Sequence, residues 1–280
     1  MLPKNYRTVT LLSVPGKVLA RIIANRILLD SYQERIGPSQ MGFCPDRSTI
    51  DAIFTANQLL GLLSSSGSVY TCLIDIKKAF DSIPRKALWD ILEHSYGFPP
   101  QMVQTLRALH TNTRCKVRVR GRLSPPFKTE RGVRQGCCIA PILFNLFIAV
   151  VIQKALEDIP DAGITVRVSG APSHDLQFPA TNDIFETLSH LLYADDLIIF
   201  ALDKKSLLSL LRRLESSFAE WGLKFNYGKT YLLRPSSTCQ SKIIDPETGE
   251  DIKLRDNSKY LGPFSQLQDP PLPLPTYRGV

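Results

Sequence analysis

The stretch that decides the fold is HLLYADDLIIFA, residues 190–201, in which two adjacent acids interrupt an apolar run. Asp195 and Asp196 lie between residues that suit a buried strand, and neighbouring carboxylates repel each other. Burying even a neutral polar group without a partner costs roughly 2–7 kcal/mol, so the two acids need a solvated or polar place. We therefore expect a hairpin of two short strands with the acids at its tip. Because acidic residues are common in turns, an ordinary solvated turn remains an open alternative.

A third acid stands in a similar setting in CLIDIKKAFD, residues 72–81, where Asp75 closes an apolar run typical of a strand. If this strand pairs with the hairpin, three carboxylates converge on one edge of a sheet and repel strongly unless a cation lies between them. Hard divalent cations prefer oxygen ligands, and magnesium keeps positions open for water and phosphate. Two such ions roughly 3.5–4 Å apart can activate a hydroxyl and stabilise a leaving pyrophosphate. The pattern predicts a candidate metal site.

The composition is that of an ordinary globular protein of one to two domains: 280 residues, 44% hydrophobic and 21% charged. Lys and Arg total 34 against 26 Asp and Glu, a net charge of +8 that fits a polyanionic partner without requiring one. The six cysteines form no C-x-x-C pair, which favours a reducing, intracellular location over a disulfide framework. The chain contains neither the pattern of a signal peptide nor an apolar run of the ~18 residues that span a bilayer.

The remaining periodicities predict an α+β protein with an antiparallel sheet packed on helices. A strand is expected over 69–76, and a two-stranded hairpin over 113–136, where basic and apolar residues alternate. Residues 158–185 are polar and are expected to be irregular, and the proline-rich residues 263–280 to form a disordered tail. Helices are expected over 13–36, 47–67, 84–97, 99–112, 140–157 and 204–222.

Three segments resemble successive polymerase motifs of reverse transcriptases, most closely those of non-LTR (LINE-type) retrotransposons. They are LIDIKKAFDSI (73–83), GVRQGCCIAPILFNLFI (132–148) and YADD (193–196). Four more blocks follow the family's order, so the resemblance extends over about residues 4–262. These blocks are NYRTVTLLSVPGKVLARIIANRI (5–27), GPSQMGFCPDRSTIDAI (37–53), WGLKFNYGKT (221–230) and KYLG (259–262).

The resemblance implies a right-hand polymerase fold with a reverse transcriptase domain over 1–262 and the thumb largely missing. Family anatomy divides the domain into fingers, palm and the start of the thumb with its primer grip. The fingers would be approximately 1–68 and 110–131, the palm approximately 69–109 and 132–234, and the thumb start 235–262. Intact family members are much longer, so the chain is expected to be a partial copy.

By the same resemblance the activity is RNA-directed DNA polymerisation, in which a primer 3′-hydroxyl attacks the α-phosphate of a dNTP opposite an RNA template. The cofactor implied is two Mg²⁺ ions, with Mn²⁺ as a substitute, and the partners are RNA template, DNA primer and dNTP, with no membrane. Family members are expected in the nucleus and cytoplasm. The implied metal ligands are Asp75, the Ile76 carbonyl, Asp195 and Asp196. Because neighbours on a strand point to opposite faces, Asp195 is expected to be the stronger ligand and Asp196 the more tolerant of change.

The remaining site residues are also carried over from the family's motifs. Lys229 is implied as the acid that protonates pyrophosphate, although a lone loop lysine is usually only solvated. Phe80 matches the bulky residue that would exclude a ribose 2′-hydroxyl, and it can be a core aromatic at the same time. The nucleotide-binding residues implied are Arg7, Arg47, Phe80, Gln135 and Gly136, and the primer-grip residues are Tyr260, Leu261 and Gly262.

One departure and two other functions stay open. Cys44 stands where relatives often carry arginine, so one template or nucleotide contact is expected to be missing. The chain could be a catalytically inactive nucleic-acid-binding remnant of a truncated element, in which case it would bind RNA without extending a primer. It could also be an RNA-dependent RNA polymerase, a function against which Phe80 argues.

Overall fold

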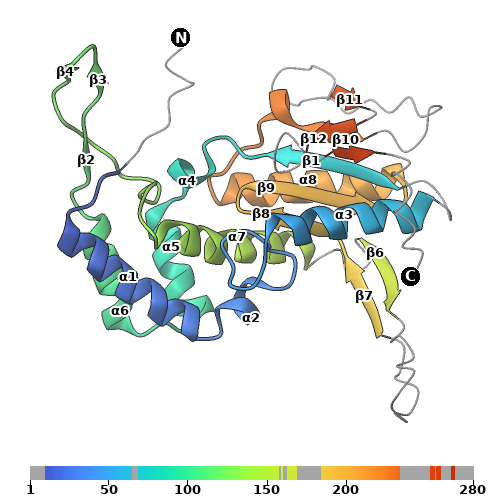
Figure 1. Ribbon diagram of the computed structural model, residues 1–280, viewed down its shortest axis with the longest axis horizontal. Helices are drawn as coiled ribbons and strands as arrows, with labels where there is room; N and C mark the ends of the chain where they lie inside the picture. The colour runs from blue at the N-terminus through green and yellow to red at the C-terminus, as the bar shows by residue number, and fades with distance from the viewer. Residues whose placement is uncertain are drawn as a thin grey trace, which may run out of the picture.

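The protein is built around one β-sheet with helices on both faces, as the computed structural model in Figure 1 shows. The structure describes residues 10–64, 69–157, 159, 163–168, 184–233, 253–255, 257–259 and 266–268. Within these ranges the expected α+β class is confirmed.

The main sheet has five strands in the order β11-β10-β1-β9-β8. The central strand β1 is antiparallel to both of its neighbours, and β8 is antiparallel to β9. Only the pairing of β10 with β11, at the other edge, is parallel. The antiparallel palm sheet expected from the sequence is therefore present, with one parallel strand added. The strands are β1 (Tyr70–Asp75), β8 (His190–Tyr193), β9 (Asp196–Ala201), β10 (Tyr231–Leu233) and β11 (Lys253–Arg255).

The two faces of the sheet bury two different sets of side chains. Cys72, Ile74 and Ile199 belong to the larger core, which also contains the inner faces of α7 (Ala140–Leu156) and α8 (Lys204–Glu220). Leu73, Ile198 and Phe200 belong to the second core, with the inner face of α3 (Thr49–Ser64). This strict alternation is what a strand with a period of two residues requires when both faces are covered.

The helices largely follow the predicted periodicities, with two interruptions. The helix expected over 13–36 is broken into α1 (Val14–Leu29) and α2 (Tyr32–Ile36), because Ser31 has a φ of 51° that no right-handed helix accommodates. The helix expected over 84–97 is α5 (Arg85–Asp90) followed by a π-helical turn at Ile91–Ser95. Two further helices are neighbours of α5 in the sequence: α4 (Ala79–Ser82) precedes it, and α6 (Pro100–His110) follows the π-helical turn.

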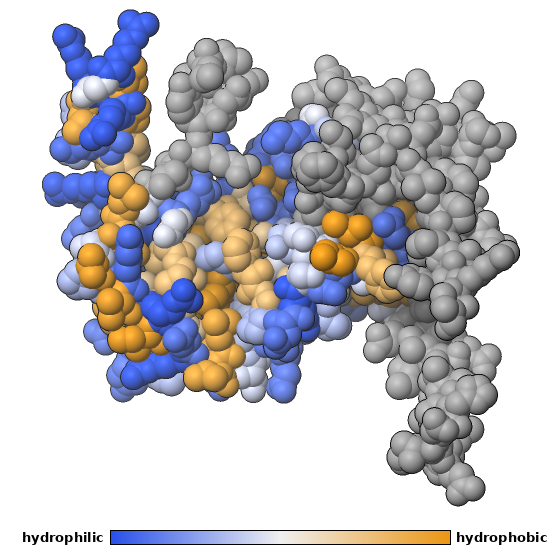
Figure 2. Space-filling model, viewed as in Figure 1, coloured by the Kyte–Doolittle hydropathy of each residue, from blue (hydrophilic) through white to orange (hydrophobic). Residues whose placement is uncertain are grey.

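The hairpin predicted over 113–136 is confirmed, and it projects from the body of the molecule (Figure 1). At its tip Arg120 and Gly121 have φ angles of 48° and 81°, the geometry of a tight two-residue hairpin loop. Figure 2 shows hydrophilic side chains at the outer end of this hairpin, with hydrophobic ones directly beside them. Its strands are β2 (Arg114–Cys115), β3 (Arg118–Val119), β4 (Arg122–Leu123) and β5 (Phe127–Lys128).

Two regions differ from the expectation. Within 158–185, expected to be irregular, β6 (Ile164–Val168) pairs in antiparallel register with β7 (Ile184–Leu188). Within the expected tail 263–280, β13 (Gln266–Gln268) pairs with β12 (Asn257–Lys259). For the strand residues within 158–185 the prediction of irregular structure was wrong. The prediction of a disordered tail over 263–280 falls mostly outside the described residues and stays a prediction.

Two other expectations from composition can be compared with the described residues. Cys44, Cys72, Cys115, Cys137 and Cys138 are all free thiols, as the absence of a disulfide pattern predicted. Across the described ranges, none of the helices combines the length and the apolar character needed to cross a membrane.

Candidate active site

The acid at the end of β1 and an acid of the hairpin meet across the sheet. In the antiparallel register of β1 and β9, Asp75 is the direct partner of Asp196. Residues directly opposite each other share a face, with Cβ atoms about 4.5–5.5 Å apart. The hairpin is also confirmed, because Tyr193 pairs with Asp196 and leaves Ala194 and Asp195 as a two-residue loop. The sheet therefore places Asp75 and Asp196 opposite each other at one end of β1 and β9, with Asp195 in the adjoining turn.

The two adjacent acids have different backbone settings. Asp196 is the first residue of β9 and is exposed, whereas Asp195 lies in the turn and is half-buried. Ala194, the other turn residue, has a φ of 57°. The alternation of strand side chains therefore applies to Asp196 and not to Asp195. The two acids are not equivalent, although the reason is the turn and not the alternation expected from the sequence.

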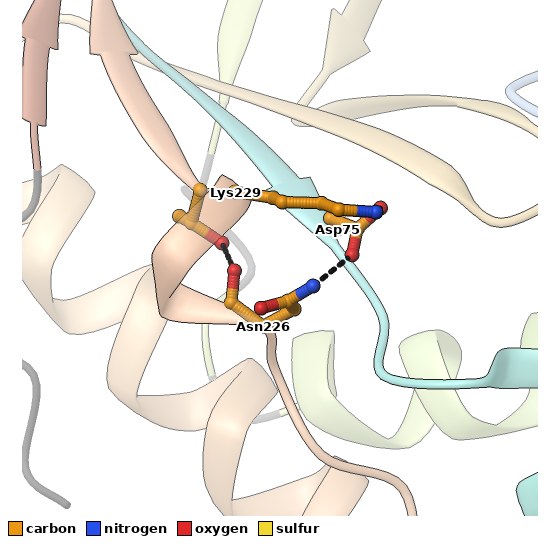
Figure 3. Close-up of polar contacts among 4 residues, drawn as sticks. Asp75, Asn226 and Lys229 are labelled. Atoms are coloured by element: carbon orange, nitrogen blue, oxygen red, sulfur yellow. Dashed lines mark hydrogen bonds and ion pairs between the residues drawn. The ribbon is translucent and has the colours of Figure 1, made fainter. Parts of the chain in front are cut away.

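Asp75 is held by two residues of the segment that follows α8, as Figure 3 shows. Asn226 Nδ2 donates a hydrogen bond to Asp75 Oδ2 at 2.7 Å, and the Asn226 backbone N–H donates to the Asp75 carbonyl at 2.8 Å. Lys229 Nζ lies 3.9 Å from Asp75 Oδ1, with 62% of its side chain exposed against 28% for Asp75. Lys229 is the last residue of the 3₁₀ turn Tyr227–Lys229, which begins directly after Asn226. The fold thus brings Lys229 next to Asp75, while its role as the acid that protonates pyrophosphate stays a prediction. Asn226 is a residue of this candidate site that the sequence reasoning missed.

The carboxylates are of the type that a hard divalent cation prefers, but the convergence of three expected from the sequence is not seen among the described residues. Carboxylate oxygens are the ligands that Mg²⁺ and similar ions prefer, and two of these acids face each other from paired strands. Among the described residues no group of three or more His, Cys, Asp or Glu side chains is gathered closely enough to hold an ion. Like charges repel when nothing lies between them, and here Lys229 and Asn226 occupy the oxygens of Asp75. The Ile76 side chain is buried, and its backbone bridges to Phe225.

Phe80 lies in the short helix α4, which follows β1 after a turn of three residues. Its half-buried ring stacks on that of Phe144 in α7, with 4.6 Å between centroids and 20° between planes. Its carbonyl accepts a hydrogen bond from the Val133 N–H at 2.9 Å. A Cβ on Gly132 would lie 2.9 Å from that same carbonyl, so a glycine is needed for this close approach. The core contact expected of Phe80 is present, and its side chain is only half-buried.

Gln135 and Gly136 pack against the chain near residue 10. The Thr10 N–H donates to the Gln135 carbonyl at 2.8 Å. Gly136 has a φ of 97°, and a Cβ there would lie 2.8 Å from the Thr10 carbonyl oxygen. A glycine is therefore required here for close approach to the backbone of Thr10, and contact of Gln135 and Gly136 with a nucleotide stays a prediction.

Arg47 makes contacts within its own loop. Its Nη1 donates to the carbonyls of Gly37 at 2.9 Å and Gln40 at 2.7 Å. The Cys44 thiol donates to the same Gln40 carbonyl at 3.2 Å, and burial raises its pKa to about 11, so it stays neutral. A nucleotide-binding role for Arg47 remains a prediction. Four other predicted residues lie outside the described ranges: Arg7, Tyr260, Leu261 and Gly262.

Arg85 is a second residue that the sequence reasoning missed. Its guanidinium donates to the carbonyls of His110 at 2.9 Å, Thr129 at 2.8 Å and Gly132 at 2.9 Å. These bonds tie the base of the β2–β5 hairpin to the segment that packs on Phe80. Beside this hairpin lies a cavity of about 1260 Å³, whose basic lining residues are Arg114, Lys116, Arg118, Arg120 and Arg134.

The fold is similar to solved telomerases. The chain aligns with apo telomerase from Candida tropicalis with a TM-score of 0.53 at 13% identity, covering 85% of this chain and 40% of that one. Telomerase from the same organism in complex with a TWJ fragment of telomeric RNA aligns with a TM-score of 0.52 at 13% identity, covering 82% and 35%. At this identity the likeness shows the fold alone, and that fold is the palm and fingers of a polymerase.

Residues 3–262 match the family model described as reverse transcriptase (RNA-dependent DNA polymerase), and the chain belongs to that family. Members of the family generally use divalent metal ions. Among relatives, an uncharacterized 149 kDa protein of transposon TX1 from Xenopus laevis is 30% identical over 274 residues, covering 96% of this chain and 19% of the relative. The Pol polyprotein of the retrotransposable element R2 from Nasonia vitripennis is 27% identical over 277 residues, covering 93% and 24%. The chain thus spans about a fifth to a quarter of the length of these relatives.

Proposed function

We propose that this chain is the polymerase region of a non-LTR retrotransposon reverse transcriptase, which extends the 3′-hydroxyl of a DNA primer by copying an RNA template. The observation that carries the proposal is the register of the sheet, which sets Asp75 opposite Asp196 beside Lys229. Asp75 and Asp195 are the main ligands of two Mg²⁺ ions, for which Mn²⁺ can substitute, with Asp196 as the third carboxylate and the Ile76 carbonyl as a further ligand. When bound, the ions would lower the pKa of the primer hydroxyl and neutralise charge on the triphosphate.

Lys229 acts as the general acid in this proposal. Its ammonium group is largely exposed and lies beside Asp75, where a triphosphate would meet the carboxylates. From that position it donates a proton to the pyrophosphate oxygen as the bond to the α-phosphate breaks. Asn226 holds the Asp75 carboxylate by one oxygen and leaves the other toward Lys229. Asn226 is thus a positioning residue for the first metal ligand.

Phe80 selects the sugar of the incoming nucleotide. Because its ring is backed by Phe144, it cannot move inward to admit a ribose 2′-hydroxyl. Gln135 and Gly136 contact the nucleotide and template, and Arg47 and Arg7 contact the triphosphate, a contact for which guanidinium groups are well suited. The basic β2–β5 hairpin contacts RNA phosphates, and Tyr260, Leu261 and Gly262 hold the primer end. For such an enzyme, locations in the nucleus and cytoplasm are expected.

Primer extension tests the proposal. Purified protein is incubated with an RNA template, a 5′-labelled DNA primer, dNTPs and Mg²⁺, in parallel with Asp195→Ala. We expect extension by the wild type, none without metal, and at least about a 10³-fold loss in the variant, since removing a metal ligand removes the ion that the reaction needs. Equal extension by both proteins contradicts the proposal. Salt-sensitive RNA binding without any extension would favour the alternative of an inactive nucleic-acid-binding remnant.

A further inference from the structure

The tip of the YADD hairpin is held by a segment far away in the sequence. Residues 39–42 lie along the outer edge of β8, where Met41 N–H donates to the Leu192 carbonyl at 2.7 Å and Leu192 N–H donates to the Ser39 carbonyl at 2.9 Å. The segment therefore forms an isolated parallel bridge, Gln40 with Leu192, at this edge of the sheet. It brings one side chain, that of Gln40, into contact with the turn.

The Gln40 side chain holds the peptide groups of the turn. Gln40 is 1% exposed, and its Oε1 accepts hydrogen bonds from the backbone N–H groups of Ala194 at 3.0 Å and Gly42 at 2.9 Å. Its Nε2 reaches the Ala194 carbonyl at 3.5 Å, a longer contact. Ala194 is the residue directly before Asp195, and its φ of 57° is unusual for a residue with a Cβ. A backbone in this conformation persists where its surroundings fix it, and the Gln40 amide is the polar group that does so.

The backbone of Gly42 also packs closely against the turn at Ala194. A Cβ on Gly42 would lie 2.4 Å from the Ala194 nitrogen, so the two backbones touch and only glycine fits. The Gly42 carbonyl accepts a hydrogen bond at 2.7 Å from Nδ2 of Asn145, a fully buried residue of α7. The same Nδ2 donates to the Tyr32 hydroxyl at 2.9 Å. The turn is thus connected through Gln40 and Gly42 to the central buried helix.

We infer that Gln40 is a positioning residue for the metal-binding carboxylates: its amide fixes the Ala194 peptide, and through it the places of Asp195 and Asp196 opposite Asp75. The inference rests on the proposed function, since it concerns the same carboxylate site. Gln40 does not touch the reacting atoms. It acts in the way that outer residues of metal sites do, by limiting the directions that the ligands can take.

A Mn²⁺-binding titration tests the inference without requiring catalysis. Binding is measured as the decrease in the EPR signal of the free ion. Gln40→Met keeps the length of the side chain and removes the acceptor. The matched control is Gln33→Met, which removes a side-chain hydrogen bond of 2.9 Å to the Pro45 carbonyl in a neighbouring part of the chain. We expect Gln40→Met to weaken Mn²⁺ binding about 10-fold or more, within the range for outer residues of metal sites, and Gln33→Met to bind like the wild type. Asp75→Asn identifies the site by abolishing the same binding.

The inference is overturned if folded Gln40→Met binds Mn²⁺ with an affinity within twofold of the wild type. It is also overturned if the wild type binds no Mn²⁺ at the Asp75 site. If Gln40→Met does not fold, Gln40→Asn decides by the same criterion, because it withdraws the amide by one methylene and keeps a polar group in place. In an active protein, the KM for dNTP should stay unchanged while kcat falls with the loss of metal affinity. A protein that binds Mn²⁺ in a Gln40-dependent way but extends no primer refutes the proposed function and supports the positioning role.

Discussion

Asp75 and Asp196 are direct partners in the antiparallel register of β1 and β9, so two like charges face each other at the end of the central strands. Like charges directly opposite each other across a sheet are destabilising, and Asn226 and Lys229 bind the Asp75 carboxylate. In the proposed function, a cation bound between the two carboxylates would offset this repulsion.

The first prediction follows from this repulsion. In EDTA, Asp196→Asn should raise the free energy of unfolding by roughly 0.2–1 kcal/mol, because one of two opposed charges is removed. Adding Mg²⁺ should then stabilise the wild type more than the variant. Urea unfolding with and without metal measures both effects, with Asp90→Asn, an exposed acid of α5, as the control. A variant less stable than the wild type in EDTA would show that the facing carboxylates do not repel.

Lys229 should matter for chemistry far more than for stability. Lys229→Met removes the acid that protonates pyrophosphate, and we expect kcat to fall about 100-fold, in the usual range for general acid catalysis. The change in the unfolding free energy should stay under about 1 kcal/mol, because an exposed ion pair contributes little. Pre-steady-state single-nucleotide incorporation measures the first quantity. Lys205→Met, on the exposed side of α8, is the control, and a kcat within threefold of the wild type would remove Lys229 from the mechanism.

Phe80 should decide between deoxyribose and ribose. Phe80→Ala opens the space above Phe144, so rNTP incorporation relative to dNTP should rise by about 10-fold or more, the size of discrimination that steric contacts in a pocket supply. Competition assays with one rNTP and the matching dNTP give this ratio. Phe54→Ala, at a ring 59% exposed on α3, serves as the control. An unchanged ratio would leave Phe80 as a core residue only.

His110 gives the fold a dependence on pH. Burial lowers its pKa from an ordinary 6.5 to about 4, opposed by the hydrogen bond between its Nδ1 and the Leu106 carbonyl and assisted by the charges of Arg85 and Arg134. The unfolded state therefore binds more protons between these two values. The stability that His110 contributes is present above pH 6.5 and is lost as the pH falls toward 4, by an amount on the order of 3 kcal/mol. Urea unfolding at pH 7, 5.5 and 4.5 should show a smaller pH dependence in His110→Gln than in the wild type, and equal slopes would contradict this assignment.

Much of the fold could be predicted from the sequence because its signals are local. The hairpin over 190–201 and the strand ending at Asp75 follow from apolar runs interrupted by acids, and α8 follows from its amphipathic spacing. The break at Ser31 was not predictable, because it depends on one backbone angle and leaves the apolar spacing unchanged. The strand β6 could have been predicted from the β-branched residues of ITVRV (164–168). Its pairing was harder to predict, because the partner strand β7 begins only at Ile184.

The carboxylates and Lys229 could be predicted from their motifs, whereas the residues that hold them could not. Asn226 reaches Asp75 across 151 residues of sequence, and Gln40 reaches Ala194 across 154. An uncharged amide carries no pattern that distinguishes a buried hydrogen-bonding group from a solvated loop residue. The only available signals were their places inside two motif blocks, GPSQMGFCPDRS and WGLKFNYGKT. Such residues become visible only when the fold brings the blocks together.

The most direct test of the central claim is the Mg²⁺ dependence of single-nucleotide incorporation by the wild type and Asp75→Asn on an RNA template with a DNA primer. The matched control is Asp203→Asn, because Asp203 caps the N-terminus of α8 and asparagine can cap equally well. The account predicts Mg²⁺-dependent incorporation by the wild type and the control, and a loss of about 10³-fold in Asp75→Asn, as for a group needed in the transition state. Incorporation by Asp75→Asn within threefold of the wild type would contradict it.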